Sequence, residues 1–336
     1  GPPVRIMEVC GTHTHEIFRL GIRKLLPEQV ELISGPGCPV CVTQVGFIDE
    51  AIYLALERQV TICTFGDLVR VPGTNMSLAG AREKGAKIRI VYSPVDAKEY
   101  AKEHPKEQVT FLSVGFETTT PSACLSVKKA REEGLTNYSI LTANKTMPQA
   151  YEALKGSADI FLYPGHVNAI TGTKLCEELA KEGVSGVVAG FTAKELLTAL
   201  AVALARFQEG RPFFVNCYPR VVTENGSPQA QKLVEEMMEP CDSEWRGLGV
   251  IKGSGMRLQE EWSAFDARKK YKIPPIQGKA NPACRCGDVL QGKCKPSDCK
   301  VFGKVCTPQH PVGACMVSGE GACSAYYMYG EAEKMK

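Results

Sequence analysis

The sequence predicts an α/β protein made of two similar Rossmann-like parallel α/β domains, followed by a smaller cysteine-rich domain. Three observations support this prediction. Up to about Val250, short β-rich apolar runs alternate with helical stretches, as in a parallel sheet that is covered on both faces. Three short motifs recur in the same order at a nearly constant offset. Finally, seven of the 15 cysteines lie between Cys284 and Cys323.

The expected strands are short runs rich in β-branched and apolar residues, each followed by a turn or a helical pattern. They cover Val4–Val9, Gln29–Ser34, Val60–Phe65, Lys87–Tyr92, Val109–Val114, Tyr138–Thr142, Asp159–Tyr163, Gly186–Ala189 and Phe213–Cys217. The helices expected between them have apolar residues at a helical period. They cover Phe47–Arg58, Ser122–Glu133, Met147–Lys155, Thr171–Glu182 and Ala193–Glu209.

The recurring motifs indicate duplicated α/β units. The matching pairs, offset by about 126 to 128 residues, are Ile33–Cys38 with Leu162–His166, Thr64–Asp67 with Gly190–Ala193, and Val91–Pro94 with Cys217–Pro219. We therefore expect a first α/β domain over residues 1–125, a second over residues 126–250 and a C-terminal domain over residues 251–336. Ligands in such folds bind beyond the carboxyl ends of the strands, where the Pro-Gly turns of this chain fall.

Beyond Val250 the pattern changes. Met256–Tyr271 is predicted to be one helix, and Ala322–Met335 another. Between them, Gly278–Gly321 is rich in Gly, Pro, Lys and Cys and has no clear period. Such a segment cannot bury a hydrophobic core of its own, so cross-links must organise it.

The composition is that of a soluble globular protein, with 44% apolar and 23% charged residues and a formal net charge of +3. This charge is too small to indicate binding to nucleic acid or to a membrane surface, and no apolar run approaches the 18 or so residues of a membrane span. No secretion signal is recognisable, so we expect a cytoplasmic protein. In that compartment, 15 cysteines favour metal ligation and thiol chemistry over a disulfide framework.

The first chemical motif follows the first expected strand and consists of Cys10, a glycine turn, His13 and His15. A thiol near imidazoles can be held as the thiolate, which is the form that binds metal or attacks an electrophile. A buried cysteine with helix-capping histidines is the plainer interpretation. We favour a functional site because these residues coincide at the carboxyl end of a strand.

The second motif places Cys38 and Cys41 in a C-x-x-C pattern that opens a helix after a strand. Thioredoxin-like redox pairs have this arrangement, with the first thiol facing solvent and its pKa lowered by helix-start amides. The alternatives are half of a zinc site and a purely structural pair, and no matching C-x-x-C completes a zinc site. Cys38 and Cys41 are therefore predicted to be redox-active.

Two further motifs supply Glu117 and His166. Glu117 lies in the hydroxyl-rich turn Ser113–Ser122. This turn could bind an anion through the amides at the start of the next helix, or it could only cap that helix. Capping alone does not explain why a glutamate stands there. The turn lacks the Gly-Lys-Ser/Thr ending of a Walker loop. His166 follows a buried strand and pairs with Cys38 in the repeat, so we expect both to line one cleft. A structural histidine is the alternative.

The C-terminal cysteines lack the two close pairs that zinc sites favour, whereas four separated thiolates suit a cubane iron–sulfur cluster. The candidates are Cys284, Cys286, Cys294, Cys299, Cys306, Cys315 and Cys323. The cysteines beyond four are inert or supply a redox thiol beside the cluster. A secreted disulfide knot is the rival interpretation, which the missing secretion signal disfavours.

Together these motifs resemble the HypD family of [NiFe]-hydrogenase maturation proteins, over essentially the whole chain. The resemblance rests on Cys10–His15, Gly35–Cys41, Gly115–Thr119, Pro164–Val167, Cys315–Ser318 and Glu320–Tyr327. It implies assembly of the Fe(CN)2CO unit in a complex with the chaperone HypC, with cyanide accepted from HypE. It also implies a bound [4Fe-4S] cluster.

The resemblance also implies roles for individual residues. Cys10 is expected to ligate the transient iron, with His13 and His15 to tune it and Cys38 with Cys41 to cycle between dithiol and disulfide. Glu117 and His166 complete the expected catalytic set. The cluster is expected to use four of the five cysteines Cys284, Cys299, Cys306, Cys315 and Cys323, with Cys315 as the spare one.

Two other functions remain open from the sequence. An iron–sulfur thiol/disulfide oxidoreductase would use the same C-x-x-C pair and cysteine cluster. The motif of Cys10, His13 and His15 argues against it, because a reductase has no need of a third thiol next to imidazoles. The other is a passive binding scaffold whose cluster is only structural.

Overall fold

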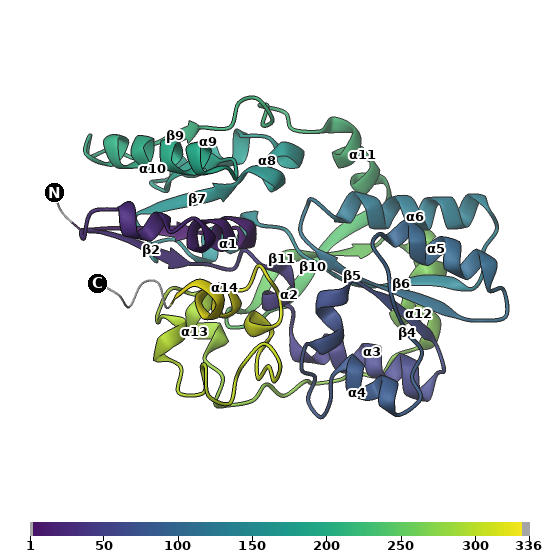
Figure 1. Cartoon of the computed structure of the whole chain (residues 1–336). Coiled ribbons are helices and arrows are strands. Elements are labelled where there is room, and N and C mark those ends of the chain that lie inside the picture. The colour runs from purple at the N-terminus through teal and green to yellow at the C-terminus, as the bar shows by residue number, and fades with distance from the viewer. Residues whose placement is uncertain (1–2, 331–336) are drawn as a thin grey trace.

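The computed structural model describes residues 3–330, which form two lobes, each built on a parallel β-sheet (Figure 1). Sheet 1 has the strand order β2-β1-β7-β8-β9. Its strands are β1 (Val4–Glu8), β2 (Val30–Ser34), β7 (Ile160–Pro164), β8 (Ser185–Ala189) and β9 (Phe214–Asn216). Ile6 of β1 pairs with Leu32 on one side and with Ile160 on the other. Strands β7 and β8 are buried along their whole length, which explains their continuous apolar sequence.

Sheet 2 has the strand order β4-β3-β5-β6, and all its neighbouring strands are parallel. Its strands are β3 (Thr61–Thr64), β4 (Ile88–Ile90), β5 (Val109–Gly115) and β6 (Tyr138–Asn144). Counted within each sheet, both sheets begin with the order 2-1-3-4 of doubly wound folds. The order therefore reverses between β1 and β7 in sheet 1 and between β3 and β5 in sheet 2, and ligands of such folds bind at these reversals.

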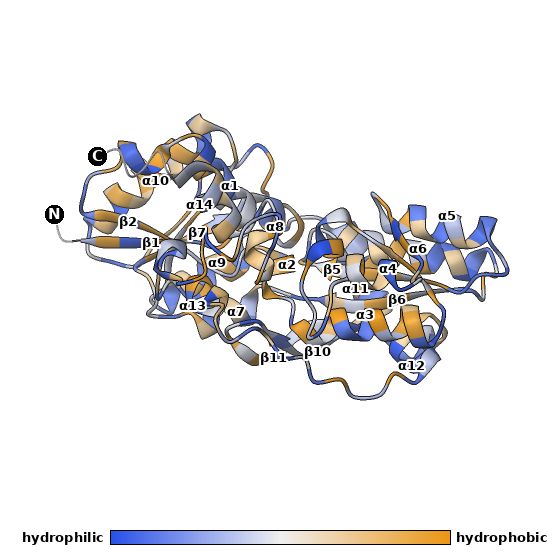
Figure 2. Ribbon diagram, turned by 60° about the horizontal axis from the view of Figure 1, so that its bottom comes forward, coloured by the Kyte–Doolittle hydropathy of each residue, from blue (hydrophilic) through white to orange (hydrophobic). Residues whose placement is uncertain are grey.

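Helices cover the faces of the two sheets. Those of the lobe of sheet 1 are α1 (Gly11–Arg19), α8 (Gly165–Thr171), α9 (Lys174–Lys181) and α10 (Ala193–Phe207). Those of the other lobe are α3 (Val45–Glu57), α4 (Leu78–Glu83), α5 (Pro94–Glu103) and α6 (Thr120–Glu132), while α7 (Pro148–Ala153) and α11 (Pro228–Met237) lie in the connections. In Figure 2, α3, α5 and α6 show both hydrophilic and hydrophobic stretches, as expected for helices that bury one face. Within residues 3–330, no helix has the length and apolar character that a membrane crossing requires.

All nine expected strands are present, so the predicted α/β class with parallel sheets is confirmed. Strand pairing, however, divides the chain differently from the expected limits at residues 125 and 250. Strands β1 and β2 join β7–β9, and β3–β6 form the other sheet. The recurring motifs also do not mark equivalent positions, because Ile33–Cys38 and Leu162–His166 belong to strands of the same sheet. The reason is physical: strand neighbours are chosen by long-range pairing, which local patterns do not encode.

The prediction of one helix over Met256–Tyr271 is wrong. An antiparallel hairpin of β10 (Met238–Trp245) and β11 (Gly249–Leu258) occupies the first part, with Met256 paired to Pro240. A 3-10 turn (Glu260–Phe265) and α12 (Ala267–Tyr271) follow. Ladder pairing with β10 holds Met256 extended, and the Asp266 carboxylate starts α12 by accepting the N–H of Arg268 at 2.9 Å.

The cysteine-rich segment folds onto the lobe of sheet 1, close to α1 (Figure 1). Its short elements are α13 (Cys286–Leu290), η4 (Pro296–Asp298), η5 (Ala314–Met316) and α14 (Ala322–Tyr329). Helix α14 packs on α1, where the rings of Phe18 and Tyr326 meet edge to face with centroids 5.6 Å apart. The predicted helix over Ala322–Met335 is present as far as Tyr329, and its part beyond residue 330 lies outside the described residues.

Candidate functional site

Cys10 lies just beyond the carboxyl end of β1, where it is the N-cap residue of α1 and is 7% exposed. Strand β1 adjoins β7, so Cys10 stands where the strand order of sheet 1 reverses. Pro164 ends β7 and Gly165 begins α8 at the same edge of the sheet. The prediction that the first motif lies at a strand's carboxyl end is therefore confirmed.

The C-x-x-C loop lies directly against Cys10. The N–H of Gly11 donates to the carbonyl oxygen of Gly37 at 3.0 Å. A Cβ atom on Gly37 would lie 2.3 Å from the backbone nitrogen of Cys10, so only glycine allows the two loops to approach this closely. The structure thus brings the first and second motifs together.

Cys38 and Cys41 form a disulfide across the start of α2 (Pro39–Val42), and their Cα atoms are 5.2 Å apart. Cys38 is 3% exposed and Cys41 is fully buried, so the expectation of a solvent-facing first thiol is wrong. The loop before them explains this burial. A Cβ atom on Gly35 would lie 2.8 Å from the side chain of Met7, so the loop is pressed onto β1 and the pair faces the protein interior.

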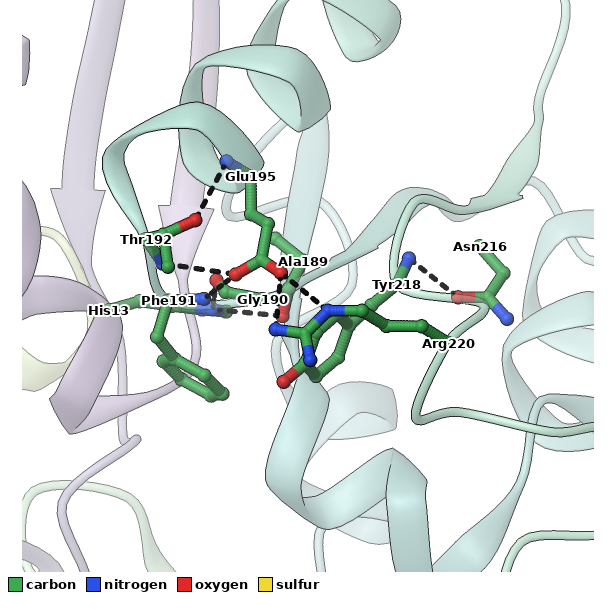
Figure 3. Close-up of polar contacts among 9 residues, drawn as sticks. All are labelled: His13, Ala189, Gly190, Phe191, Thr192, Glu195, Asn216, Tyr218 and Arg220. Carbon is green, nitrogen blue, oxygen red and sulfur yellow. Dashed lines mark hydrogen bonds and ion pairs between the residues drawn. The ribbon is translucent and has the colours of Figure 1, made fainter.

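His13 is buried and is fixed to the end of β8. Its Nε2 donates to the carbonyl oxygens of Ala189 and Gly190 at 3.2 and 3.0 Å (Figure 3). Because carbonyl oxygens only accept, Nε2 carries the proton. Burial lowers the pKa of His13 to about 4, which keeps the ring neutral at pH 7. Its Nδ1 therefore presents a lone pair, for which residues 3–330 supply no hydrogen-bond partner.

Phe191 joins His13 to His166. Its ring stacks on both imidazoles, with centroids 4.7 Å from that of His13 and 3.9 Å from that of His166, which is exposed. His15 does not belong to this group, because its Nδ1 hydrogen-bonds to the carbonyl oxygen of Gly319 at 3.0 Å. The structure therefore stacks two of the three predicted histidines on the same phenylalanine ring, and the third hydrogen-bonds to the cysteine-rich segment.

Glu195 fixes the loop that carries Phe191, as Figure 3 shows. Its Oε2 accepts the backbone N–H groups of Phe191 and Thr192 at 3.0 and 3.1 Å, and its Oε1 accepts from the Arg220 guanidinium at 2.7 Å. Burial opposes ionisation, but Arg220 and these N–H groups hold the pKa of Glu195 at about 2. The sequence analysis missed this residue, although Thr192-x-x-Glu195 is a capping-box pattern and does form one at the start of α10.

Glu320 is a second residue that the sequence analysis missed. Its Oε1 accepts the hydroxyl of Thr12 at 2.9 Å, and a Cβ atom on Gly11 would lie 2.6 Å from its Cβ. Burial raises the pKa of the Cys10 thiol to about 12, although hydrogen bonds at the start of α1 lower this pKa in part. The negative charge of the Glu320 carboxylate also raises it. A metal bound at Cys10 must therefore displace a proton. The only signal for Glu320 was its place in a motif of the family resemblance.

Glu117 lies just beyond β5 of sheet 2. Its Oε1 accepts the N–H of Met147 at 2.9 Å, whereas its buried Oε2 has no hydrogen-bond partner within residues 3–330. Burial raises the pKa of Glu117 to about 7. The carboxyl group faces a small pocket that is also lined by Ile170 and Gln231. Glu117 is thus set up to exchange a proton near neutral pH.

The cysteine-rich segment brings its thiols together in one mainly apolar pocket, here called the thiol pocket. The cysteines that line it are Cys284, Cys286, Cys299, Cys306, Cys315 and Cys323. Cys286 and Cys315 form a disulfide, so Cys315 is not free to ligate a metal and is removed from the five candidates. The other four remain thiols, and Cys294 lies outside this pocket.

The four thiols suit an iron–sulfur cluster in their chemistry. Val301, Phe302 and Met316 exclude water from the pocket, and the N–H of Val312 donates to Sγ of Cys306 at 3.3 Å, which is a contact that stabilises a thiolate. Within the described part of the chain, no three His, Cys, Asp or Glu side chains are grouped so that they could hold a single metal ion. A donor set of four cysteines spread around one pocket fits a cluster better than a lone ion.

Comparison with known proteins identifies the family of this chain. The profile of the family HypD (Hydrogenase formation hypA family) matches residues 1–330. Three proteins named hydrogenase maturation factor HypD are 42%, 44% and 43% identical to this chain, those of Cupriavidus necator, Rhodobacter capsulatus and Escherichia coli K12. Each match covers 98% of this chain and 90% of the relative. The chain therefore belongs to the HypD family of hydrogenase maturation factors.

Proposed function

We propose that this protein is the scaffold on which the Fe(CN)2CO unit of a [NiFe]-hydrogenase is assembled, in a complex with HypC and with HypE as the source of cyanide. The observation that carries the proposal is the contact between Gly37 and Cys10. It joins the loop that carries Cys10 to the loop that carries the Cys38–Cys41 pair, at the edge where sheet 1 reverses its strand order.

The iron unit is the cargo in this proposal, and Cys10 is the thiolate that holds it together with a thiolate of HypC. Cys10 is protonated at neutral pH before it binds, so loading releases its proton. His13 lies three residues further on, and its unpartnered Nδ1 is suited to orient a ligand of the iron or to accept a proton. Phe191 and the exposed His166 form the outer wall of this site.

The electron balance explains why a thiol pair is needed. Cleaving the S–C bond of a thiocyanate into a thiol and a cyanide ion consumes two electrons and one proton. A dithiol formed by Cys38 and Cys41 supplies two electrons and two protons and becomes the disulfide. One proton goes to the departing thiol and the other is released, while cyanide binds the iron. The disulfide in this structure corresponds to the oxidised state of this cycle.

We also propose that Cys284, Cys299, Cys306 and Cys323 hold a [4Fe-4S] cluster, which supplies single electrons to reduce the pair again. The positions of the helices support this. Element η5, which carries Cys315, packs on α2, so the Cys286–Cys315 disulfide stands between the thiol pocket and the Cys38–Cys41 pair.

The direct test is the variant Cys10→Ala, purified in complex with HypC. The infrared bands of iron-bound cyanide and carbonyl should disappear, while the iron and acid-labile sulfide of the cluster stay unchanged. Cys63→Ala is the matched control, because Cys63 is equally buried but lies in β3 of sheet 2. Bands that persist without the Cys10 thiol, or that vanish equally in the control, would contradict the scaffold role.

An iron–sulfur thiol/disulfide oxidoreductase is the second candidate, and the neighbouring disulfides favour it. This enzyme would reduce a protein disulfide with electrons from its cluster, and its turnover would not depend on Cys10. The scaffold proposal predicts instead that Cys10→Ala abolishes iron carriage. Measuring iron carriage and disulfide-reductase turnover on this one variant separates the two functions.

A further inference from the structure

A pocket of about 480 Å³ lies beside the thiol pocket and has no part in the function proposed above. Strand β2, Arg5 of β1, the turns after α1 and the cysteine-rich segment form it. The cations that line it are Arg5, Arg23, Lys24, Lys293 and Lys295. Among residues 3–330, two carboxylates line it, those of Glu31 and Asp298, and Arg23 is paired with the buried Glu8. We call it the basic pocket.

Two lysines at the rim of the basic pocket, Lys293 and Lys295, carry the charge on which the argument depends. Glu31 lies 3.5 Å from the Arg5 guanidinium, and the Asp298 carboxylate accepts the backbone N–H of Lys295 at 2.8 Å. Lys293 and Lys295 are exposed, and neither side chain forms an ion pair with a carboxylate of residues 3–330. At Lys293 and Lys295 the rim of the pocket therefore carries a positive charge that no carboxylate of residues 3–330 neutralises.

One layer of side chains separates the basic pocket from the thiol pocket. The buried Val289 lines both of them. Tyr326 lines the basic pocket, and its ring meets that of Phe302 in the thiol pocket edge to face, with centroids 5.7 Å apart. The free, half-buried Cys294 lies on the basic side. An electron entering at this surface would reach the four thiols across one thin wall.

We propose that the basic pocket is the docking surface of an acidic electron-transfer protein, which reduces the cluster behind Val289. This inference rests on the cluster proposed above. In each encounter one electron passes from the reduced donor to the cluster, and no bond forms or breaks. Redox proteins bind one another through small, transient interfaces, and opposite charges speed their encounter. A small acidic iron–sulfur protein fits both the size and the charge of this surface.

Other anionic partners fit less well. The formal net charge of the whole chain is only +3, which gives little general attraction to a nucleic acid or an anionic membrane. A free phosphate needs donors aimed at one point. The guanidinium of Arg5 instead donates to the carbonyl oxygens of Ser157 and Gly292 at 3.0 and 2.9 Å.

The test uses the full chain with its cluster and a plant-type [2Fe-2S] ferredoxin as the acidic probe. The double variant Lys293→Glu, Lys295→Glu should lower the affinity for the probe about tenfold at low salt and remove most of its salt dependence. Reduction of the cluster by the reduced ferredoxin should slow by a similar factor, whereas reduction by photoreduced deazaflavin should not change. The control is Lys232→Glu, Lys252→Glu, which changes the net charge equally at exposed lysines of α11 and β11.

The outcomes separate this inference from the proposed function. Iron and sulfide analysis of the same samples shows whether the chain holds a cluster. If the chain binds the probe at the basic pocket but holds no cluster, the proposed cluster is contradicted and the docking surface is not. Equal losses in the two double variants would overturn the docking surface, since only the net charge would then matter. Phosphate, nucleic acid or anionic vesicles that displace the probe at low concentration would overturn it as well.

Discussion

Gly37 and Cys10 touch through their backbones: a Cβ atom added to Gly37 would lie 2.3 Å from the nitrogen and 2.4 Å from the Cα atom of Cys10. The hydrogen bond from Gly11 to Gly37 joins the same two loops. A contact between backbones cannot give way as a flexible side chain can. The loops that carry the three thiols are therefore positioned as one unit, and a change in one loop must displace the other.

The first prediction follows from this contact. Gly37→Ala should lower the free energy of unfolding by about 2 kcal/mol, because the added methyl group overpacks a site that cannot relax. Urea unfolding measures the effect. Gly319→Ala is the control, because a Cβ atom there meets nothing within 4 Å, and it should change the stability by less than about 0.5 kcal/mol. Equal stability of the two variants would show that the loops move apart freely.

The second prediction concerns Glu195. Glu195→Gln should lower the free energy of unfolding at pH 7 by about 1 to 2 kcal/mol, mainly by weakening hydrogen bonds to the N–H groups of Phe191 and Thr192. The Arg220 pair adds little, because the Arg220 side chain is 65% exposed. The His13 ring, held by the same loop, should show a changed NMR environment.

The pH dependence of this effect has a definite sign. The pKa of Glu195 is about 2 in the folded protein, below its ordinary 4.5, so the unfolded chain takes up the proton first as the pH falls. The stability difference between wild type and Glu195→Gln should be full above pH 5 and shrink between about pH 4.5 and pH 2. A difference that stays constant over this range would exclude the charge as its source.

The sequence predicts the strands well and their assembly poorly. Strands are local apolar runs, so their positions can be read from the pattern. The neighbour of β1 is β7, more than 150 residues further along the chain, and no local signal encodes that pairing. The hairpin β10–β11 was missed for a similar reason. Its strand residues around Met256 have no clear alternation, and pairing with β10 decides their conformation.

The residues of the candidate site also fall into those that the sequence predicts and those that only the fold reveals. Cys10, His13 and the Cys38–Cys41 pair stand out because their residue types are rare and their spacings are short. Phe191, Glu195 and Glu320 act through contacts with residues far away in the sequence, so only the fold reveals them. The disulfide that removes Cys315 from the candidate ligands is likewise a long-range pairing.

The third prediction separates the cysteines of the thiol pocket. The double variant Cys286→Ser, Cys315→Ser should keep about four iron and four sulfide ions per chain, because these two residues form a disulfide and leave four thiols for the cluster. Cys306→Ser should lose most of both. Iron and sulfide analysis with EPR spectroscopy gives the answer, and loss of the cluster in the double variant would mean that Cys286 or Cys315 is a ligand.

The fourth prediction concerns Glu117, whose buried Oε2 lacks a hydrogen-bond partner within residues 3–330. Its pKa is raised to about 7, so the folded protein holds this proton more tightly than the unfolded chain does. Stability should therefore fall as the pH rises from about 4.5 to 7, by roughly 3 kcal/mol from this group alone. Glu117→Gln should remove that fall.

Urea unfolding at pH 5 and pH 8 measures the change in stability. Glu236→Gln, at an exposed residue of α11, is the control and should behave as wild type. An identical loss of stability between pH 5 and pH 8 in Glu117→Gln and wild type would show that the carboxyl group is ionised and hydrated in the native protein.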